Sequence, residues 1–509
     1  MVPMLESYVK RILSSRVYEL AEETPLQPAP LLSKRLGREV LLKREDLQPV
    51  FSFKLRGSYN KMAQLSDVAK AKGVIAASAG NHAQGVAMAA RRLGIRATIV
   101  MGRNTPSIKV NAVRAHGARV VLHGDFYDEA YEHAQMLTRE EDLTFVHPYD
   151  DVDVIAGQGT IGLEIVNQHP GRPDVIYVPV GGGGLIAGIA AFVKYLYPTT
   201  RVIGVEPQGS HCLAAAKEAG RRVRLPAEGL DLFADGVSVA QIGRETFKIA
   251  RDHVDDVVVV DVDEICAAIK DVFEETRVIT EPAGALAVAG MKKHLAESAQ
   301  EASSVVAVVS GANVNFDRLR HISERAEVGE HREAILAVSI DEEKGSFLRF
   351  CRALGKRGIT EFNYRYAGEG ASAHIFVGLQ TVTPEDREQV VEDLRSKQYE
   401  VVDMTANEAA KLHVRHMVGG RNFADVAELL FRFEFPERPG ALLGFLHELG
   451  ADWNITLFHY RNHGSAFGRV LVGFAAEQSQ RRRLQGYLKR VGYRFWEETE
   501  NPAYSLFLR

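Results

Sequence analysis

The chain has 509 residues, with 62 Lys and Arg against 66 Asp and Glu and a formal net charge of −4. This length exceeds what one hydrophobic core usually serves, so we expect more than one domain. The balanced charge, without a block of basic residues, argues against nucleic acids and membrane surfaces as partners.

The amino-terminal segment, residues 1–27, mixes acidic and basic residues and has no apolar stretch followed by a small-residue cleavage site. This argues against a secretory signal and against a transit peptide. The three cysteines, Cys212, Cys266 and Cys351, lie far apart and match no metal-ligand spacing. The sequence therefore predicts a cytoplasmic protein without disulfides or structural zinc.

Residues 30–320 alternate short apolar runs with segments of helical periodicity. Such alternation is typical of parallel sheets that are covered by helices on both faces. One uncharged run, 175–193, is long enough to span a bilayer, but Pro179 and four glycines divide it into a strand and a helix. We therefore predict a two-lobed, doubly wound α/β domain that binds ligands after the carboxyl ends of its strands. The expected strands include 73–78, 97–101, 175–180, 202–207 and 305–311.

The segment 51–60, FSFKLRGSYN, contains one lysine, Lys54, among aromatic and small residues. A single lysine in a mixed segment is usually a solvated surface charge. A lysine close to a cation such as Arg56 in a partly apolar site can instead lose its proton and act as a nucleophile or a general base. The segment by itself does not decide between these two interpretations.

The segment 78–85, SAGNHAQG, lies at an expected strand-to-helix junction. Ser78, Asn81 and His82 offer polar side chains, while Ala79 and Gly80 keep the backbone approachable, which suits a carboxylate or a ring hydroxyl. Simple capping of the following helix is the alternative. The segment 308–315, VVSGANVN, repeats the theme with Ser310 at the end of a strand.

Four consecutive glycines, Gly181–Gly184, also lie between an expected strand and helix. Glycines let several N–H groups converge on an anion at a helix amino terminus, so this loop predicts a phosphate site. A plain tight turn would need fewer glycines. A nicotinamide site matches less well, because G-x-G-x-x-G is absent from the first strand-to-helix turn.

From about residue 321 the charge density rises and the α/β alternation stops. The sequence from 335 onwards then recurs from 430 onwards, with Gly345 corresponding to Gly440 and Tyr364 to Tyr460. Each copy predicts a strand, a glycine turn, a helix and two or three further strands, in the ferredoxin-like manner. The expected division is a catalytic domain 1–322, a linker 323–334, and two modules at 335–420 and 421–509.

A reactive lysine, a phosphate loop and polar loops at strand ends are together what a pyridoxal phosphate enzyme requires. The segments SFKLRGSYN, SAGNHAQGVA, PVGGGGLIAGIA, EPAGALA and SGANVNFDRLR resemble those of the fold type II pyridoxal-phosphate enzymes, the tryptophan-synthase-β class. Within this class the chain is most similar to the biosynthetic threonine deaminases, also called threonine ammonia-lyases. The paired C-terminal modules resemble the ACT-like regulatory domains of that family.

This resemblance implies a role for each residue of the motifs. Lys54 would be the Schiff-base lysine, Phe53 would pack beside the cofactor ring, and Asn81 would contact the ring 3′-oxygen. Ser310 would face the ring nitrogen, where a hydroxyl gives a weaker electron sink than an aspartate and so suits elimination. The cofactor phosphate would bind Gly181, Gly182, Gly183, Gly184 and Leu185, and the substrate carboxylate would bind Ser78, Ala79, Gly80, Asn81 and His82.

The resemblance also implies an activity and its control. The expected reaction is the deamination of L-threonine, and secondarily of L-serine, to a 2-oxo acid and ammonia; with threonine it is the first step of isoleucine biosynthesis, with isoleucine as inhibitor and valine as activator. Tyr364 and Tyr460 occupy equivalent places in the two modules and are candidates to contact these effectors, although tyrosines of this kind can also simply pack in a sheet. The family is usually tetrameric.

Two alternatives stay open from the sequence. A serine dehydratase or racemase on the same scaffold would use Lys54 in the same way, and one methyl group of the substrate is worth only about 1–3 kcal/mol in a pocket. An amino-acid sensor without catalysis is the second, although such a protein would not need Lys54, the glycine loop and Ser310 together. Metal dependence is also open, since Glu164, Glu206, Asp235 and Glu281 have no diagnostic spacing.

Overall fold

The protein divides into two compact units, Met1–Ala326 and Glu327–Arg509, in a computed structural model. Each unit is described by itself. The structure describes residues 2–103, 105–124, 127–226, 229–230, 233–297, 302–330, 332–341, 343, 345–355, 357–365, 372–407, 410–411, 414–417, 427–436, 441–449, 453–461, 467–501, 504 and 508.

The larger lobe of the first unit is built on a six-stranded sheet with the order β1-β2-β10-β7-β8-β9. The strand pairs are parallel except for β1, which runs antiparallel to β2 at the edge. The central strands are continuously apolar and buried because helices cover both faces, as the sequence predicts. The strands are β1 (Leu26–Pro28), β2 (Glu39–Arg44), β7 (Val175–Pro179), β8 (Arg201–Pro207), β9 (Asp256–Val260) and β10 (Ser304–Val309).

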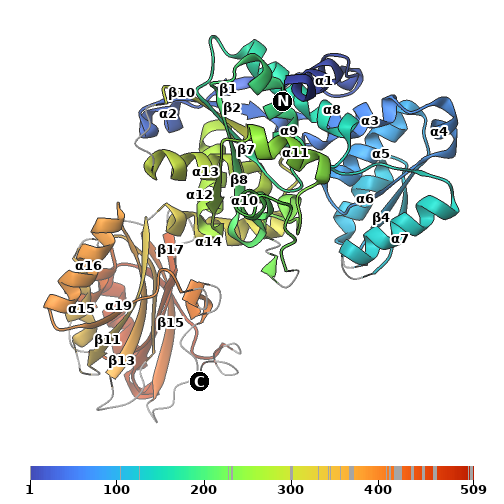
Figure 1. The fold of residues 1–509 in the computed structure, drawn as a ribbon. Helices are drawn as coiled ribbons and strands as arrows, with labels where there is room; N and C mark the ends of the chain where they lie inside the picture. The colour runs from blue at the N-terminus through green and yellow to red at the C-terminus, as the bar shows by residue number, and fades with distance from the viewer. Residues whose placement is uncertain are drawn as a thin grey trace. The chain divides into compact units, whose positions relative to one another are not determined.

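Two hydrophobic clusters lie on opposite faces of this sheet. One cluster joins the sheet to helices that include α2 (Pro30–Leu36), α12 (Val262–Thr276) and α13 (Pro282–Glu297). The other joins it to helices on the opposite face (Figure 1). The helices of this second group are α1 (Val2–Leu13), α8 (Val152–Gln168), α9 (Gly184–Leu196), α10 (Cys212–Glu218) and α11 (Arg244–His253).

The smaller lobe has a four-stranded parallel sheet with the order β5-β4-β3-β6. Its strands are β3 (Val74–Ala77), β4 (Ala97–Met101), β5 (Arg119–Leu122) and β6 (Thr144–Phe145). The accompanying helices are α3 (Lys54–Ala63), α4 (Asp67–Lys72), α5 (Asn81–Leu93), α6 (Ser107–Ala115) and α7 (Tyr127–Glu140) (Figure 1).

Local signals set many of the helix ends. Asp261 and Glu264 form a reciprocal capping box at the start of α12. Helices α2 and α5 end at Gly37 and Gly94, whose φ angles of 65° and 67° are left-handed and favour glycine. These boundaries therefore follow from the sequence alone.

The second unit is a single eight-stranded sheet with the order β14-β11-β13-β12-β16-β17-β15-β18. It consists of two halves with the same connectivity, strand-helix-strand-strand-helix-strand, joined where β12 pairs with β16. The first half contains β11 (Glu333–Asp341), α15 (Ser346–Leu354), β12 (Ile359–Arg365), β13 (Ser372–Gln380), α16 (Pro384–Ser396) and β14 (Glu400–Asp403). The second contains β15 (Glu428–Pro436), α18 (Ala441–Leu449), β16 (Ile455–Arg461), β17 (Phe467–Ala475), α19 (Arg481–Val491) and β18 (Arg494–Glu497).

The expected repeat of ferredoxin-like modules is therefore present, with one correction. The predicted pattern had one helix and then two or three strands, but a second helix, α16 or α19, precedes the last strand of each half. Gly345 has a φ of 85° before α15, as a glycine turn requires. Its expected counterpart, Gly440, lies outside the described residues.

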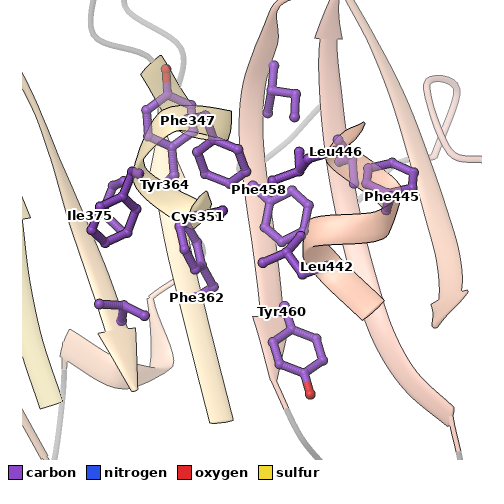
Figure 2. Packing of buried hydrophobic residues seen from close by; sticks show 14 of the residues in the cluster. Phe347, Cys351, Phe362, Tyr364, Ile375, Leu442, Phe445, Leu446, Phe458 and Tyr460 are labelled. Atoms are coloured by element: carbon purple, nitrogen blue, oxygen red, sulfur yellow. The ribbon is translucent and has the colours of Figure 1, made fainter. Parts of the chain in front are cut away.

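Aromatic side chains pack around the seam between the halves. Across the β12–β16 ladder, Phe362 faces Tyr460 and Tyr364 faces Phe458. The ring of Phe347, on α15, lies 4.9 Å from that of Phe362 and 5.3 Å from that of Phe458 (Figure 2). The seam is thus part of one continuous core that spans both halves.

The segment 323–334, the expected linker, contains the end of helix α14 (Leu319–Gly329) and the start of β11. The division into two units falls within this helix, between residues 326 and 327. Among the described residues, no helix is both long and apolar enough to cross a membrane.

Candidate active site

Lys54 is the first residue of α3, and the loop before it is attached to the end of β10. The Phe53 N–H donates to Ser310 O over 3.2 Å, and the Ala312 N–H donates to Phe51 O over 2.9 Å. Phe51 has a φ of 55°, a strained value for a residue with a side chain. These contacts bring Lys54 to the carboxyl end of the large sheet, where ligands of α/β proteins bind.

The amine of Lys54 lies in a partly buried environment. Its Nζ donates to Pro148 O over 2.9 Å and lies 5.3 Å from the centre of the Phe53 ring. Burial lowers the pKa of Lys54 to about 8, although the nearby Glu281 carboxylate acts in the opposite direction. A useful fraction of this amine is therefore neutral near physiological pH, as a nucleophile or general base requires.

Arg56 does not lie beside Lys54 as a second site cation but forms the centre of a buried ion network. Its guanidinium binds Glu45 at 2.8 Å and Glu164 at 2.5 Å, and Lys43 also binds Glu164 at 2.5 Å. Removing one member of such a network leaves an uncompensated buried charge, which is strongly destabilising. The network therefore anchors α3, and with it Lys54, to β2 and α8.

The glycine loop connects β7 to α9 and is enclosed by other segments. A Cβ atom at Gly182 would lie 2.2 Å from the ring of Tyr149, and one at Gly181 would lie 2.9 Å from Val237 Cα. Gly183 has a left-handed φ of 89°. The Gly182 carbonyl accepts hydrogen bonds from Thr246 Oγ1 at 2.8 Å and from another main-chain N–H. Glycine is thus required sterically at these positions.

The same loop places the amino terminus of α9 at the end of β7. The first N–H groups of a helix lack intrahelical acceptors and carry partial positive charge, so they attract anions. Leu185, the second residue of α9, is in the first turn and is buried. A loop of glycines that excludes side chains and leads into a helix amino terminus fits the phosphate of pyridoxal phosphate.

The 78–82 segment forms the junction between β3 and α5. The Ser78 side chain accepts a hydrogen bond from the Gly80 N–H at 3.2 Å, and a Cβ atom at Gly80 would meet no atom within 4 Å. Asn81 Nδ2 donates to Glu281 Oε1 over 2.6 Å. Gly80 thus borders open space beside the first turn of α5, which is suited to a carboxylate.

His82 is the one residue of this segment whose side chain departs from expectation. Its ring is buried, with Nε2 2.8 Å from Val146 O and Nδ1 3.3 Å from Ser58 Oγ. Burial, with a further contribution from Lys54, lowers the pKa of His82 to about 3, so the ring is neutral. Because both ring nitrogens are engaged, the main-chain N–H is the donor that His82 can offer a substrate.

Ser310 ends β10 and is buried. Its hydroxyl donates to Ala283 O over 3.1 Å, and its N–H donates to Gly284 O over 3.3 Å. Since the Phe53 N–H donates to Ser310 O, this serine is only one hydrogen bond from the residue that precedes Lys54. The structure therefore brings Lys54, Phe53 and Ser310 together at one end of the large sheet.

The sequence analysis missed the loop 147–151, HPYDD. Asp150 caps α11 by accepting from the Glu245 N–H at 2.7 Å, and Asp151 caps α8 by accepting from the Asp153 N–H at 2.8 Å. Between them and Lys54 lie Pro148 and Tyr149, which contact the amine and the glycine loop. Adjacent aspartates before a helical segment are a capping signal that could have indicated this loop.

The four scattered carboxylates have separate roles. Glu164 belongs to the Arg56 network, and Glu206 accepts from the Leu213 N–H at the start of α10. Asp235 pairs with Lys109 at 2.8 Å, while Glu281 binds Asn81. Within the described residues, no group of three or more His, Cys, Asp and Glu side chains is arranged to hold a metal ion.

Comparisons with known proteins agree with this geometry. A family model described as pyridoxal-phosphate dependent enzyme matches residues 17–311, and one described as C-terminal regulatory domain of threonine dehydratase matches residues 324–414 and 419–508. The chain is 53% identical over 504 residues to "L-threonine dehydratase biosynthetic IlvA" of Burkholderia multivorans, covering 98% of this chain and 99% of that protein. The protein of the same name from Escherichia coli is 52% identical over 502 residues, covering 98% and 97%.

Solved structures resemble about two thirds of the chain. The processed form of threonine deaminase isoform 2 from Solanum lycopersicum has a TM-score of 0.62 and 48% identity, covering 64% of this chain and 94% of that one. Maize serine racemase has a TM-score of 0.59 and 33% identity, covering 64% and 98%. The predicted cofactor and fold class are confirmed, and the match to the regulatory domain favours the dehydratase over the racemase. The chain belongs to the family of biosynthetic L-threonine dehydratases, which are pyridoxal-phosphate enzymes with a C-terminal regulatory domain.

Proposed function

We propose that this chain eliminates water from L-threonine and that the released product takes up water again on hydrolysis to 2-oxobutanoate and ammonia, under feedback control by isoleucine. The observation that carries the proposal is the position of Lys54, a partly buried amine with a lowered pKa that donates to Pro148 O, next to Tyr149, whose ring packs on the glycine loop. Bound pyridoxal phosphate supplies an electron sink that is conjugated with the α-carbon of the substrate.

Lys54 holds the cofactor before substrate binds and then takes the α-proton. The Pro148 carbonyl, 2.9 Å from Nζ, orients the amine and accepts a hydrogen bond from its protonated form. Because burial lowers the pKa of Lys54 to about 8, the amine can give up and regain a proton near neutral pH. The glycine loop and Leu185 would hold the phosphate, and Phe53 would pack beside the ring.

The remaining site residues orient the two reactants. Asn81 would contact the ring 3′-oxygen, and Ser310 would face the ring nitrogen with a hydroxyl, which cannot keep that nitrogen protonated as an aspartate would. Ser78, Ala79 and Gly80, with the Asn81 and His82 N–H groups, bind the substrate carboxylate at the start of α5. Fixing the carboxylate places the α-hydrogen toward Lys54, and such orientation is worth several orders of magnitude in rate.

Each proposed domain has its own role. Residues 1–322 carry out catalysis, residues 323–334 form a linker, and residues 335–420 and 421–509 form two regulatory modules. Tyr364 and Tyr460 are the proposed effector contacts for isoleucine and valine. Both are buried and occupy equivalent positions on the seam between the two halves of the second unit. We further propose that the protein works in the cytoplasm as a homotetramer and accepts L-serine as a secondary substrate.

A keto-acid assay with L-threonine and L-serine, each with and without isoleucine, tests this function. Faster turnover of threonine with inhibition by isoleucine supports the proposal. Racemisation of serine without keto-acid release would favour a racemase. Binding of isoleucine without turnover of either substrate would favour an amino-acid sensor.

A further inference from the structure

A chain of side-chain hydrogen bonds leads from a main-chain carbonyl to a buried carboxylate beside Lys54. Asn313 Nδ2 donates to Val50 O over 2.8 Å and to Asn81 Oδ1 over 2.6 Å. Asn81 Nδ2 then donates to Glu281 Oε1 over 2.6 Å. The Glu281 side chain is buried, with 5% of the residue exposed.

The direction of this chain is set by its first member. A main-chain carbonyl can only accept, so the amide nitrogen of Asn313 must face Val50. Its second hydrogen then points to Asn81, whose side-chain oxygen must accept it. The Asn81 side-chain nitrogen therefore faces Glu281. A flipped Asn81 would place N–H against N–H and lose both bonds.

One hydrogen of Asn81 Nδ2 goes to Glu281, and among the described residues the structure assigns the second hydrogen no acceptor. We propose that Glu281 and Asn313 are positioning residues, which act through Asn81 to aim this second hydrogen at the 3′-oxygen of the cofactor ring. The inference rests on the role of Asn81 in the proposed function. It adds two residues that do not contact the cofactor themselves.

The chain of hydrogen bonds through Asn81 also connects the two lobes of the first unit. Asn81 begins α5 in the smaller lobe, whereas Glu281 precedes α13 and Asn313 follows β10 in the larger lobe. The Asn81 amide is thus oriented only when the lobes have the arrangement of this structure. A Cβ atom at Gly311 would lie 2.4 Å from Glu281 Oε1, so a glycine there gives the carboxylate its room.

The test is titration of pyridoxal phosphate into the full-length apoprotein. The readouts are the dissociation constant, the absorbance maximum of the bound cofactor and the unfolding midpoint of the apoprotein. Glu281→Ala and Asn313→Leu each remove one end of the hydrogen-bond chain. Glu281→Gln instead keeps an oxygen that can accept from Asn81. Asp271→Asn is the matched control, because it changes another buried carboxylate of the same lobe, paired with Arg35 and Lys292, outside the chain.

We expect Glu281→Ala and Asn313→Leu to raise the dissociation constant about tenfold and to shift the absorbance maximum, because the partly buried Asn81 amide loses its orientation. Glu281→Gln should restore most of the affinity, and Asp271→Asn should lower the unfolding midpoint with unchanged affinity. If Glu281→Ala fails to fold, Asn313→Leu decides the same question.

Wild-type affinity and spectrum in both Glu281→Ala and Asn313→Leu would overturn the inference, as would Glu281→Gln behaving like Glu281→Ala. Asn81→Ala separates this failure from a failure of the site assignment. If Asn81→Ala weakens cofactor binding while the other two variants do not, the inference alone is wrong. If Asn81→Ala has no effect, the role of Asn81 in the proposed function is wrong as well.

Discussion

Arg365, at the end of β12 in the first half of the C-terminal unit, forms an ion pair with Glu428 of the second half at 2.8 Å. Both side chains are buried, and Glu428 also accepts from Tyr504 Oη at 2.7 Å. The pair therefore adds a polar link between the two halves at the end of the β12–β16 ladder, where Arg365 pairs with Leu457. Its removal is a direct test of how strongly the halves depend on each other.

Arg365→Ala should lower the free energy of unfolding of the C-terminal unit by about 3–5 kcal/mol, because it leaves the Glu428 carboxylate buried and unpaired. Denaturant unfolding of the full chain, followed by fluorescence, measures this loss. Replacing both partners by apolar residues should cost less than the single change. Arg349→Ala, which breaks an exposed pair with Glu343, is the control and should change stability by at most about 1 kcal/mol.

Lys54→Ala should abolish the deamination of threonine and the visible absorbance band of the lysine-bound cofactor. Loss of a positioned base alone costs about 10²–10⁴ in rate. Lys34→Ala, an exposed lysine on α2, is the control for general effects of removing a charge. Threonine deamination at the wild-type rate in Lys54→Ala would remove this lysine from the mechanism.

Gly182→Ala should weaken cofactor binding, because its Cβ atom would lie 2.2 Å from the Tyr149 ring and displace the phosphate loop. Overpacking of this kind also destabilises a buried site by about 1–3 kcal/mol. Titration of pyridoxal phosphate and thermal unfolding measure the two effects. Gly171→Ala, where a Cβ atom meets nothing within 4 Å, should leave cofactor affinity as in the wild type.

The stability of the apoprotein should depend on pH through Glu281. Burial, reinforced by Asp235, raises the pKa of Glu281 to about 7, while Asn81, Lys109 and Arg318 act in the opposite direction. Between about pH 4.5 and 7, Glu281 is protonated in the folded state and ionised in the unfolded state. The contribution of Glu281 to stability is therefore complete at low pH and is lost as the pH rises through this range.

The comparison with Glu281→Gln isolates this effect, because glutamine does not titrate. Relative to the variant, the wild type should lose up to about 3 kcal/mol of unfolding free energy between pH 4.5 and 7.5. Denaturant titrations of both apoproteins at several pH values provide the measurement. A difference between the two proteins that is constant across this range would show that Glu281 keeps an ordinary pKa.

Tyr364→Ala and Tyr460→Ala should raise the isoleucine concentration for half inhibition by about tenfold or more, if each loses one buried contact to the effector. Figure 2 shows the two hydroxyl groups pointing in opposite directions from the seam, so the variants should affect separate effector contacts. Tyr399→Ala is the control, since Tyr399 packs against the same core through Phe350 but lies off the seam. Unchanged inhibition in both seam variants would leave the tyrosines with a packing role alone.

Much of the fold can be predicted from the sequence, because short-range patterns such as apolar runs and glycine loops are sufficient to predict it. Apolar runs such as 175–180, ended by Gly181–Gly184, predict a buried strand and the loop after it. The repeat after residue 330 predicts two similar modules, yet not the second helix of each. That helix in the first module, α16, is strongly polar, with only Val390, Val391 and Leu394 buried, so its periodicity is weak.

The candidate site also combines features that the sequence predicts with features that only the tertiary structure decides. Sequence pattern, together with the family resemblance, predicts that Lys54, the glycine loop, Asn81 and Ser310 belong to one pyridoxal phosphate site, because each motif carries its own chemistry in a short segment. Only the tertiary structure decided that the His82 ring is occupied, that Arg56 lies in an ion network, and that Glu281 and Asn313 meet at Asn81. These partners are up to 232 residues apart in the chain, and contacts over such separations depend on how sheets and helices pack, which no local pattern encodes.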